Sequence, residues 1–265
     1  MTFTEANGGS LEPTIPPRIG AGSFAAIYAP PGRPIVFKVP HAPEDAPVVR
    51  REFNSLHVLY TECNTDPFFA LPRPLAFYDP ATNDVLFFPR YFERGRRSAP
   101  RRPFHAEFFA SLPGPGPRAC YVMDRVPPLP HPVGDVVRAN FYSERAVAAR
   151  TPLPLLCRLY FGKERIYPSA FVNPNNFPLD AARYDTLLHA WKAKAGGDGD
   201  GDLPTKEDVA AGMGEMLSRI HWIAGYDARD VEFVMAGAPD SAEVRFHLID
   251  FNQVRVSFLP SVYNS

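Results

Sequence analysis

The sequence has few of the residues that mark metal-binding and secreted proteins. It contains only three cysteines, Cys63, Cys120 and Cys157, and they form no Cys-x-x-Cys pair. A structural zinc site needs four compactly spaced ligands, so we expect no zinc, and we expect the thiols to be buried as small hydrophobic groups. An odd number of cysteines without a secretion signal indicates a reduced, intracellular chain, either cytoplasmic or nuclear.

Long apolar runs and an excess of charge are also missing. No stretch of ~18 apolar residues occurs, and the polar segment Met1 to Ser10 has no apolar run suited to secretion, so no membrane partner is expected. The formal net charge of −1 gives no overall field that would attract nucleic acid. Nucleic acid is therefore not an expected partner.

The chain does have enough apolar residues for a substantial core. Its composition is 45% hydrophobic, and 265 residues allow either one large domain or two lobes. Proline is abundant, with 31 residues against a usual share of ~5%, which predicts long connections and interrupted helices. Residues 1–17, which end at Pro16-Pro17, are predicted to be a disordered leader.

The first half predicts a small, mostly antiparallel sheet with one helix. Apolar segments at residues 18–28 and 34–39 flank Pro30-Pro31-Gly32, which is typical of a strand–turn–strand unit. Residues 46–63 carry apolar side chains at helical spacing. Further strands are predicted at residues 74–78, 84–89 and 119–125. The arginine-rich segment Arg94 to Arg102 is interpreted as a solvated loop, with a nuclear-import or phosphate-binding patch as the alternative.

The second half has more helical periodicity, so the fold class is α+β. Helices are predicted at residues 133–149, 180–194 and 205–223, and short strands at residues 231–235 and 244–249. Thr205 is expected to cap the last helix, with Asp208 completing a partial capping box. Residues 196–202 form a Gly/Asp-rich linker whose spacing does not fit an EF-hand.

Two short motifs in the first half could contact phosphates. Gly20, Gly22 and Ser23 form a Gly-rich turn between two strands within residues 18–28, and glycine lets backbone amides approach phosphate closely because it has no side chain. Lys38 ends an apolar run on the next strand, which favours a position facing a ligand over an exposed strand position. Glu52 lies beside the apolar face of the first helix and is the natural partner of this lysine; a solvent-facing carboxylate is the alternative.

Several carboxylates in the second half complete the pattern. Asp250 comes directly after an apolar strand and before Phe251-Asn252, and a carboxylate there could hold Mg²⁺ against phosphates. Asp227 precedes Glu232 by five residues, and Asp230 competes with Asp227 as a candidate base. An ordinary polar turn after a helix is the alternative interpretation of this segment.

The order of these motifs resembles that of the protein-kinase-like superfamily. The resemblance implies a two-lobed fold, with a small antiparallel-sheet N-lobe over residues 18–126 and a shortened, helix-rich C-lobe over residues 127–265. It also implies ATP and Mg²⁺ as ligands. Ala25 stands where the family often has a third glycine, while Gly225 and Tyr226 replace the histidine and arginine of its catalytic loop.

The resemblance implies a role for each motif. The Gly-rich turn and the lysine would bind phosphates, the helix glutamate would orient the lysine, and backbone groups of the hinge between the lobes would bind adenine. An aspartate would position an acceptor hydroxyl, and two further carboxylates would hold Mg²⁺. The implied residues are Lys38, Glu52 and Asp227 for catalysis; Gly20, Gly22, Ser23, Lys38, Met123 and Arg125 for nucleotide binding; and Asp250 and Glu232 for Mg²⁺.

Residues 156–162, 230–234 and 250–253 resemble a narrower group, the uncharacterised fungal kinase-like proteins often labelled as zinc-finger proteins. This resemblance covers roughly residues 150–255 and implies a fold without an established substrate. Members of the group usually continue further, so we expect a shortened chain that lacks an activation segment and the helices that hold a peptide substrate.

We therefore expect a degenerate kinase-like protein that acts as an interaction or regulatory module. It would bind a protein partner, retain an ATP–Mg²⁺ site and have no protein kinase activity. The alternative is an active small-molecule phosphotransferase that uses ATP–Mg²⁺. An unrelated α+β domain whose motifs coincide by chance is a third interpretation.

Overall fold

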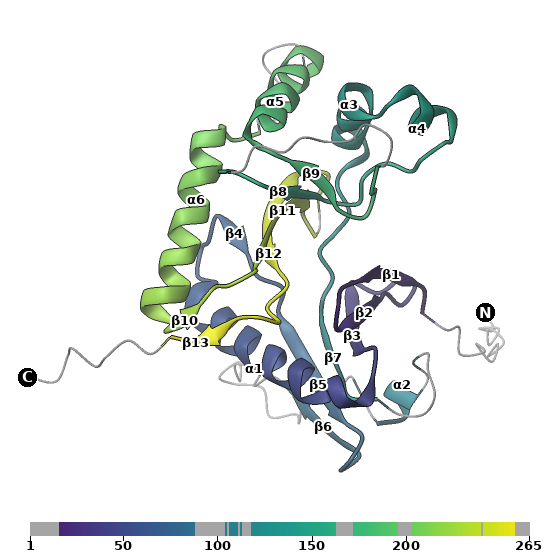
Figure 1. Cartoon of the computed structure of the whole chain (residues 1–265), viewed down its shortest axis with the longest axis vertical. Helices are drawn as coiled ribbons and strands as arrows, with labels where there is room; N and C mark the ends of the chain where they lie inside the picture. Colours follow the sequence, from purple (N-terminus) through teal and green to yellow (C-terminus); the bar gives the residue numbers. More distant parts are fainter. Residues whose placement is uncertain are drawn as a thin grey trace, which may run out of the picture.

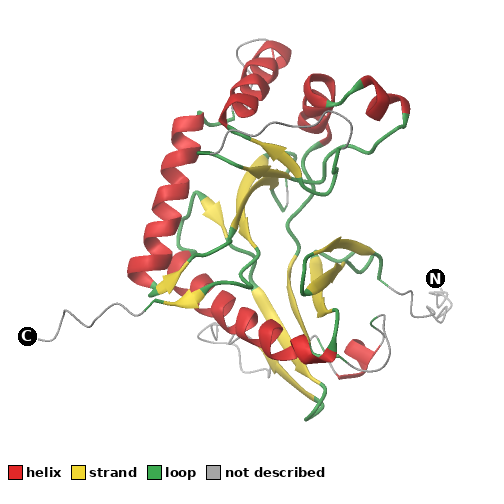
Figure 2. Cartoon of the chain, viewed as in Figure 1, coloured by secondary structure: helices red, strands yellow, loops and turns green. Residues whose placement is uncertain are grey.

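The computed structural model describes residues 16–87, 104, 106–110, 112, 118–162, 172–195, 203–239 and 241–257. It is a mixed α+β structure with antiparallel sheets and several helices (Figure 1). Figure 2 shows helices along one side and at the top of the molecule, with strands running through the middle and reaching the opposite and lower edges. The helices are α1 (Ala46–Cys63), α2 (Ala106–Ala110), α3 (His131–Phe141), α4 (Glu144–Ala148), α5 (Ala181–Ala195) and α6 (Lys206–Ser218).

The first half of the chain forms a six-stranded sheet in the order β1-β2-β3-β7-β5-β6. Every neighbouring pair in this sheet is antiparallel. Its strands are β1 (Arg18–Ala21), β2 (Ala25–Tyr28), β3 (Ile35–Pro40), β5 (Pro74–Asp79), β6 (Asp84–Phe87) and β7 (Cys120–Asp124). All six residues of β3 are buried, because this strand lies in the middle of the sheet.

Both faces of the six-stranded sheet carry buried aromatic side chains. Phe53 of α1 packs against the rings of Phe77 and Tyr121, at centroid distances of 5.7 and 5.8 Å. On the opposite face, Phe109 of α2 stacks on Tyr78 at 5.0 Å. Phe77 and Tyr78 are neighbours in β5 and belong to separate core clusters, as the alternation of side chains along a strand requires. The packing of Phe53 on the first face fixes α1 against the sheet that contains β3.

A second sheet has five strands in the order β4-β12-β11-β8-β9. At its centre β11 and β12 form an antiparallel hairpin, while the pairs β4–β12 and β8–β9 are parallel. Its strands are β4 (Phe69–Ala70), β8 (Cys157–Leu159), β9 (Phe177–Leu179), β11 (Glu232–Gly237) and β12 (Val244–Ile249). A separate pair is formed by β10 (Tyr226–Asp227) and β13 (Arg255–Val256). Helix α6 runs along the outer side of the second sheet (Figure 1).

Several sequence predictions are confirmed. Helix α1 spans residues 46–63 as predicted, and β5 and β6 form the predicted hairpin as far as the described residues extend. The capping box at the start of α6 is present, since the Thr205 hydroxyl accepts the Asp208 amide and the Asp208 carboxylate accepts the Thr205 amide. All three cysteines are buried free thiols, as expected.

Other predictions need correction. The helix predicted at residues 133–149 is two helices, because the Ser143 hydroxyl accepts the Ala146 amide and starts α4 after a break. The α-helix predicted at residues 205–223 ends at Ser218 and continues as a π-helical turn, Arg219–Ile223. The second half is also less purely helical than predicted, because β8, β9, β10 and β13 were not expected.

The predictions for residues 1–15, for Arg94 to Arg102 and for the linker at residues 196–202 fall outside the described residues. The division at residue 126 stays a prediction. Strand β4, from the first half, pairs with β12 of the second half. Among the helices described, none is both long and apolar enough to cross a membrane.

Candidate functional site

The site is built around Lys38, a buried cation in the middle of the six-stranded sheet. Lys38 lies on β3 opposite Ile27 of β2 and Tyr121 of β7, so neighbouring strands fix its backbone on both sides. Only 8% of the residue is exposed. A buried ammonium group is costly unless carboxylates compensate it, so its partners determine what it can do.

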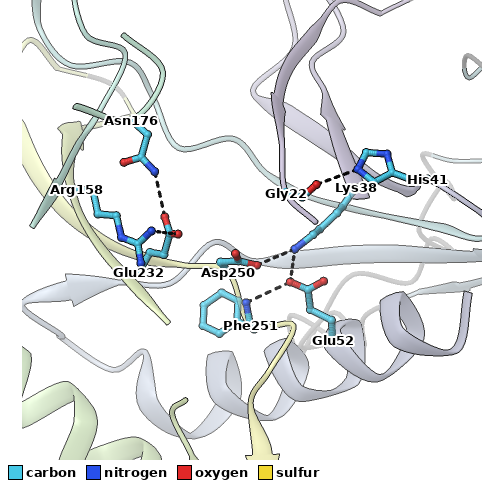
Figure 3. A network of polar contacts seen from close by, with 9 residues as sticks. All are labelled: Gly22, Lys38, His41, Glu52, Arg158, Asn176, Glu232, Asp250 and Phe251. Atoms are coloured by element: carbon cyan, nitrogen blue, oxygen red, sulfur yellow. Dashed lines mark hydrogen bonds and ion pairs between the residues drawn. The ribbon is translucent and has the colours of Figure 1, made fainter. Parts of the chain in front are cut away.

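Two carboxylates from distant parts of the chain meet this lysine (Figure 3). Lys38 Nζ lies 2.5 Å from Glu52 Oε1 and 3.1 Å from Asp250 Oδ1. Glu52 comes from α1 and is almost fully buried, and its Oε1 also accepts the backbone amide of Phe251 at 3.2 Å. The structure therefore brings together three of the predicted site residues, contributed by β3, α1 and the turn after β12.

The charge balance at Lys38 keeps it protonated. Burial by itself would lower the pKa of Lys38, but attraction by Glu52 and then Asp250 outweighs this effect and raises the pKa above its usual value. The lysine is thus a permanent cation. It can accept an anionic group of a ligand as a further partner without any change in its protonation.

Asp250 is the more accessible of the two carboxylates. It lies just beyond β12 with a φ of +62°, a left-handed backbone conformation that an aspartate tolerates better than a branched residue. Its side chain is 33% exposed, and it binds Lys38 through Oδ1 only. Within the part of the chain that the structure describes, Oδ2 has no hydrogen-bond partner and is available to a ligand or a cation.

Glu232 lies next to this group but is already engaged. It begins β11 and pairs with Ile249, the residue before Asp250. Its Oε1 forms an ion pair with Arg158 of β8, and its Oε2 accepts the side-chain amide of Asn176 at 3.4 Å. Burial raises the pKa of Glu232, Arg158 opposes the rise, and Asp250 adds to it. The predicted role of Glu232 as a Mg²⁺ ligand stays a prediction.

Sequence reasoning missed Arg158 and Asn176. Arg158 lies inside a segment whose resemblance was noted, but no local signal connects it to a carboxylate 74 positions later. Asn176 lies just before β9, and its buried Oδ1 has no hydrogen-bond partner among the described residues. Pairing of β8 with both β9 and β11 brings these side chains together, and strands this short carry little pattern.

The Gly-rich turn occupies the predicted place between β1 and β2. The Gly22 amide donates to the Ala25 carbonyl at 2.9 Å, and His41 Nε2 contacts the Gly22 carbonyl at 2.9 Å. A side-chain Cβ at Gly20 or Gly22 would meet only ordinary van der Waals contacts, and Ser23 is exposed. The turn is therefore compact and open to a ligand, and His41 is a neighbour that the sequence did not indicate.

The predicted hinge, which contains Met123 and Arg125, begins within the last residues of β7 and continues beyond it to Val126. The amide of Asp124 donates to the Arg73 carbonyl and that of Arg125 to the Pro34 carbonyl, both at 3.0 Å. At Arg125 it is therefore the carbonyl, rather than the amide, that remains for a base edge. Met123 is half-buried and packs against the core.

Asp227 is not joined to the other site residues by any contact that the structure describes. It is exposed on β10, opposite Arg255 of β13. Its carboxylate makes no hydrogen bond or ion pair with any residue that the structure describes. Asp230, the competing candidate, has a φ of +60° in the turn between β10 and β11. Neither aspartate contacts Lys38, Glu52 or Asp250.

Comparison with known proteins identifies no relative of this chain. No family model matches the sequence, no curated protein matches it, and no solved structure matches the fold. The chemistry must be judged from the site itself.

The side chains of this site fit a divalent cation only if phosphate oxygens supply some of its ligands. Over the described ranges, no group of three or more histidine, cysteine, aspartate or glutamate side chains is arranged to hold a metal. Mg²⁺ typically binds through one or two carboxylates and completes its shell with water and substrate phosphates. One accessible carboxylate beside a fixed ammonium group therefore fits a metal–phosphate ligand better than a free metal ion.

Proposed function

We propose that this chain has a protein-kinase-like, two-lobed fold and binds ATP with Mg²⁺ at Lys38 and Asp250. We further propose that it acts as an interaction or regulatory module without protein kinase activity. The observation that carries the proposal is the contact of Lys38 with both Glu52 and Asp250, residues 14 and 212 positions away. Three motifs identified separately in the sequence thus converge on one ammonium group.

Each residue has a defined task in this proposal. Lys38 would bind phosphate oxygens, and Glu52 would keep the ammonium group in place through a buried ion pair. The free Oδ2 of Asp250 would accept a cation, and the bound Mg²⁺ would supply neutralisation of phosphate charge. The Gly22 amide already donates to the Ala25 carbonyl, so other amides of this turn would lie against the phosphates.

The architecture supports the fold part of the proposal. A six-stranded antiparallel sheet carries the Gly-rich turn and the lysine, and α1 follows β3 and brings its glutamate back to that lysine. The second sheet supplies Asp250 from its central hairpin. This arrangement supports the relation between two lobes that the sequence resemblance implies.

Two further features favour a binding module over a protein kinase. Asp227, the expected base, makes no hydrogen bond or ion pair with the Lys38 group, and Glu232 is held by Arg158. Large apolar side chains are exposed on neighbouring elements, with Trp222 67% and Val256 62% accessible. Exposed apolar side chains that adjoin one another in a patch are typical of protein contact sites.

Thermal unfolding with ATP and Mg²⁺ tests the proposal. A ligand at ~100 times its dissociation constant adds about 2.7 kcal/mol to the free energy of unfolding, which raises the melting temperature by roughly 5–10 °C for a chain of this size. The matched control is Asp250→Asn, because asparagine has the same shape and tolerates the positive φ at this position. We expect most of the shift to disappear in this variant and in the absence of Mg²⁺. No shift in the wild type, or an equal shift in both proteins, contradicts the proposal.

A small-molecule phosphotransferase is the second candidate, and the free carboxylate of Asp227 favours it. This group is exposed and lies on β10, whose partner β13 begins five residues after Asp250. A positioned carboxylate contributes roughly 10²–10⁴-fold to such reactions. Asp227→Asn should then lower phosphoryl transfer from labelled ATP to small hydroxyl compounds by about this factor and leave the thermal shift unchanged. Absence of any transfer by the wild type would favour the binding module.

A further inference from the structure

Arg158 and Glu232 form a pair in which no oxygen of the carboxylate is left free. Glu232 Oε1 contacts the Arg158 guanidinium, and Oε2 accepts the Asn176 amide. The Glu232 side chain is only 15% exposed. A metal ion could reach this carboxylate only by displacing a charged partner from a mostly buried position.

The guanidinium is itself held in place by more than the carboxylate. Arg158 lies on β8 opposite Val234 of β11, which fixes its backbone beside the start of the central hairpin. Its Cζ also lies 4.8 Å from the centroid of the Tyr160 ring, a cation–π contact. Arginine carries a planar guanidinium that pairs well with a carboxylate, so it suits the role of a fixed counter-ion.

The charges follow one another in a row across the site (Figure 3). Arg158 comes first, then Glu232, Asp250, Lys38 and Glu52. The two outer carboxylates each have a cation directly beside them. Asp250 shares Lys38 with Glu52 and keeps one oxygen free, so it is the one carboxylate of the row that is open to a further cation.

We infer that Arg158 acts as a built-in counter-ion that closes Glu232 to metal, so that the nucleotide binds with a single divalent cation, at Asp250. This inference rests on the proposed nucleotide site. Mg²⁺ gives up its water ligands reluctantly and would meet a guanidinium at Glu232, whereas at Asp250 it meets an unpaired oxygen. Arg158 is thus a positioning residue that sets the number of metal ions.

Equilibrium dialysis with Mn²⁺ and a non-hydrolysable ATP analogue measures this number directly. The quantity is bound Mn²⁺ per bound nucleotide, after subtraction of the dialysate. We expect one Mn²⁺ in the wild type and two in Arg158→Gln, which keeps a polar side chain but removes the charge. Arg158→Gln combined with Glu232→Gln should return the count to one, because the second ion would need the Glu232 carboxylate. Arg158→Lys keeps the charge and should also give one.

The outcomes separate this inference from the function on which it rests. If the wild type binds no nucleotide, the proposed function fails. If it binds nucleotide with two Mn²⁺, or if folded Arg158→Gln still binds one, the counter-ion role is wrong and the nucleotide site stands. Should Arg158→Gln not fold, Glu232→Gln decides, because a count that falls from one to zero would make Glu232 the metal ligand and overturn the inference.

Discussion

At the scale of single residues, His247 shows how a buried polar group makes stability depend on pH. It lies in the middle of β12, is 5% exposed, and its Nε2–H donates to the Gly237 carbonyl at 3.0 Å. Burial lowers the pKa of His247 to about 4, and the nearby Arg245 acts in the same direction. The folded protein therefore contains the neutral imidazole.

The sign of the pH dependence follows from this depressed pKa. The unfolded chain takes up a proton near pH 6.5, while the folded chain resists protonation until about pH 4. The contribution of the neutral His247 to stability is fully present above pH 6.5 and is lost as the pH drops toward 4. Between pH 7 and pH 5 we expect His247 to account for a loss of about 2 kcal/mol in the free energy of unfolding.

Urea unfolding of wild type and His247→Gln at both pH values measures this loss. Glutamine retains an N–H donor for the Gly237 carbonyl but does not titrate. The pH dependence should be shallower in this variant than in the wild type or in His57→Gln, whose histidine also has a lowered pKa but is far less buried. Parallel curves for wild type and His247→Gln would show that the imidazole is not kept neutral.

At the scale of elements, α6 contains two glycines with opposite surroundings. Gly212 is buried, and a Cβ there would lie 2.6 Å from the Phe68 ring and 2.9 Å from the Phe68 Cβ. Gly214, two residues later, is exposed and has open space around it. The close approach at Gly212 lets α6 pack against the segment that leads into β4.

Substitution of each glycine by alanine gives a matched pair. Gly212→Ala should destabilise the protein by about 1–3 kcal/mol, because the ring and the Cβ of Phe68 must both move. Gly214→Ala should stabilise it by roughly 0.5–1 kcal/mol, because alanine favours the helix and meets nothing. Chemical denaturation of the two variants tests both signs, and equal effects would mean that Phe68 does not approach the helix.

The elements differ in how well the sequence predicted them, and the reason is physical. Helix α1 and the capping box at Thr205 are local patterns and were predicted correctly. Strands β4, β8 and β10 have two or three residues each and exist because of their partners, so no periodicity indicates them. In the site, Lys38, Glu52 and Asp250 lie in recognisable motifs. The ion pair of Arg158 with Glu232 exists only because β8 pairs with β11, which no local motif indicates.

At the scale of the whole molecule, the Lys38 group joins the two main sheets. Lys38 belongs to the six-stranded sheet, and Asp250 and Phe251 follow the central hairpin of the second sheet. Glu52 contacts both sides, since its Oε1 accepts Lys38 Nζ and the Phe251 amide. The ion pair is therefore a structural connection as well as a candidate ligand site.

A double-mutant cycle tests this structural role. Lys38→Met leaves the buried Glu52 without its cation and should destabilise the protein by roughly 3–5 kcal/mol. Addition of Glu52→Gln removes the unpaired charge and should recover at least about 1 kcal/mol, because neighbouring substitutions couple. Denaturant unfolding of the wild type, the two single variants and the double variant gives the coupling. If the double variant is less stable than Lys38→Met, the lysine does not compensate a buried carboxylate.

The parallel pairing of β4 with β12 affects how the chain reaches this structure. Phe69 lies beside Phe246, although 177 positions separate them. During synthesis on the ribosome, β4 leaves the exit tunnel long before its partner exists, and its two residues can pair only once most of the chain has emerged. Contacts of such large sequence separation slow folding. The edge of the second sheet at β4 should thus form late. In pulse-labelling hydrogen exchange during refolding, the β4 amides should still exchange at times when the amides of the β11–β12 hairpin are already protected.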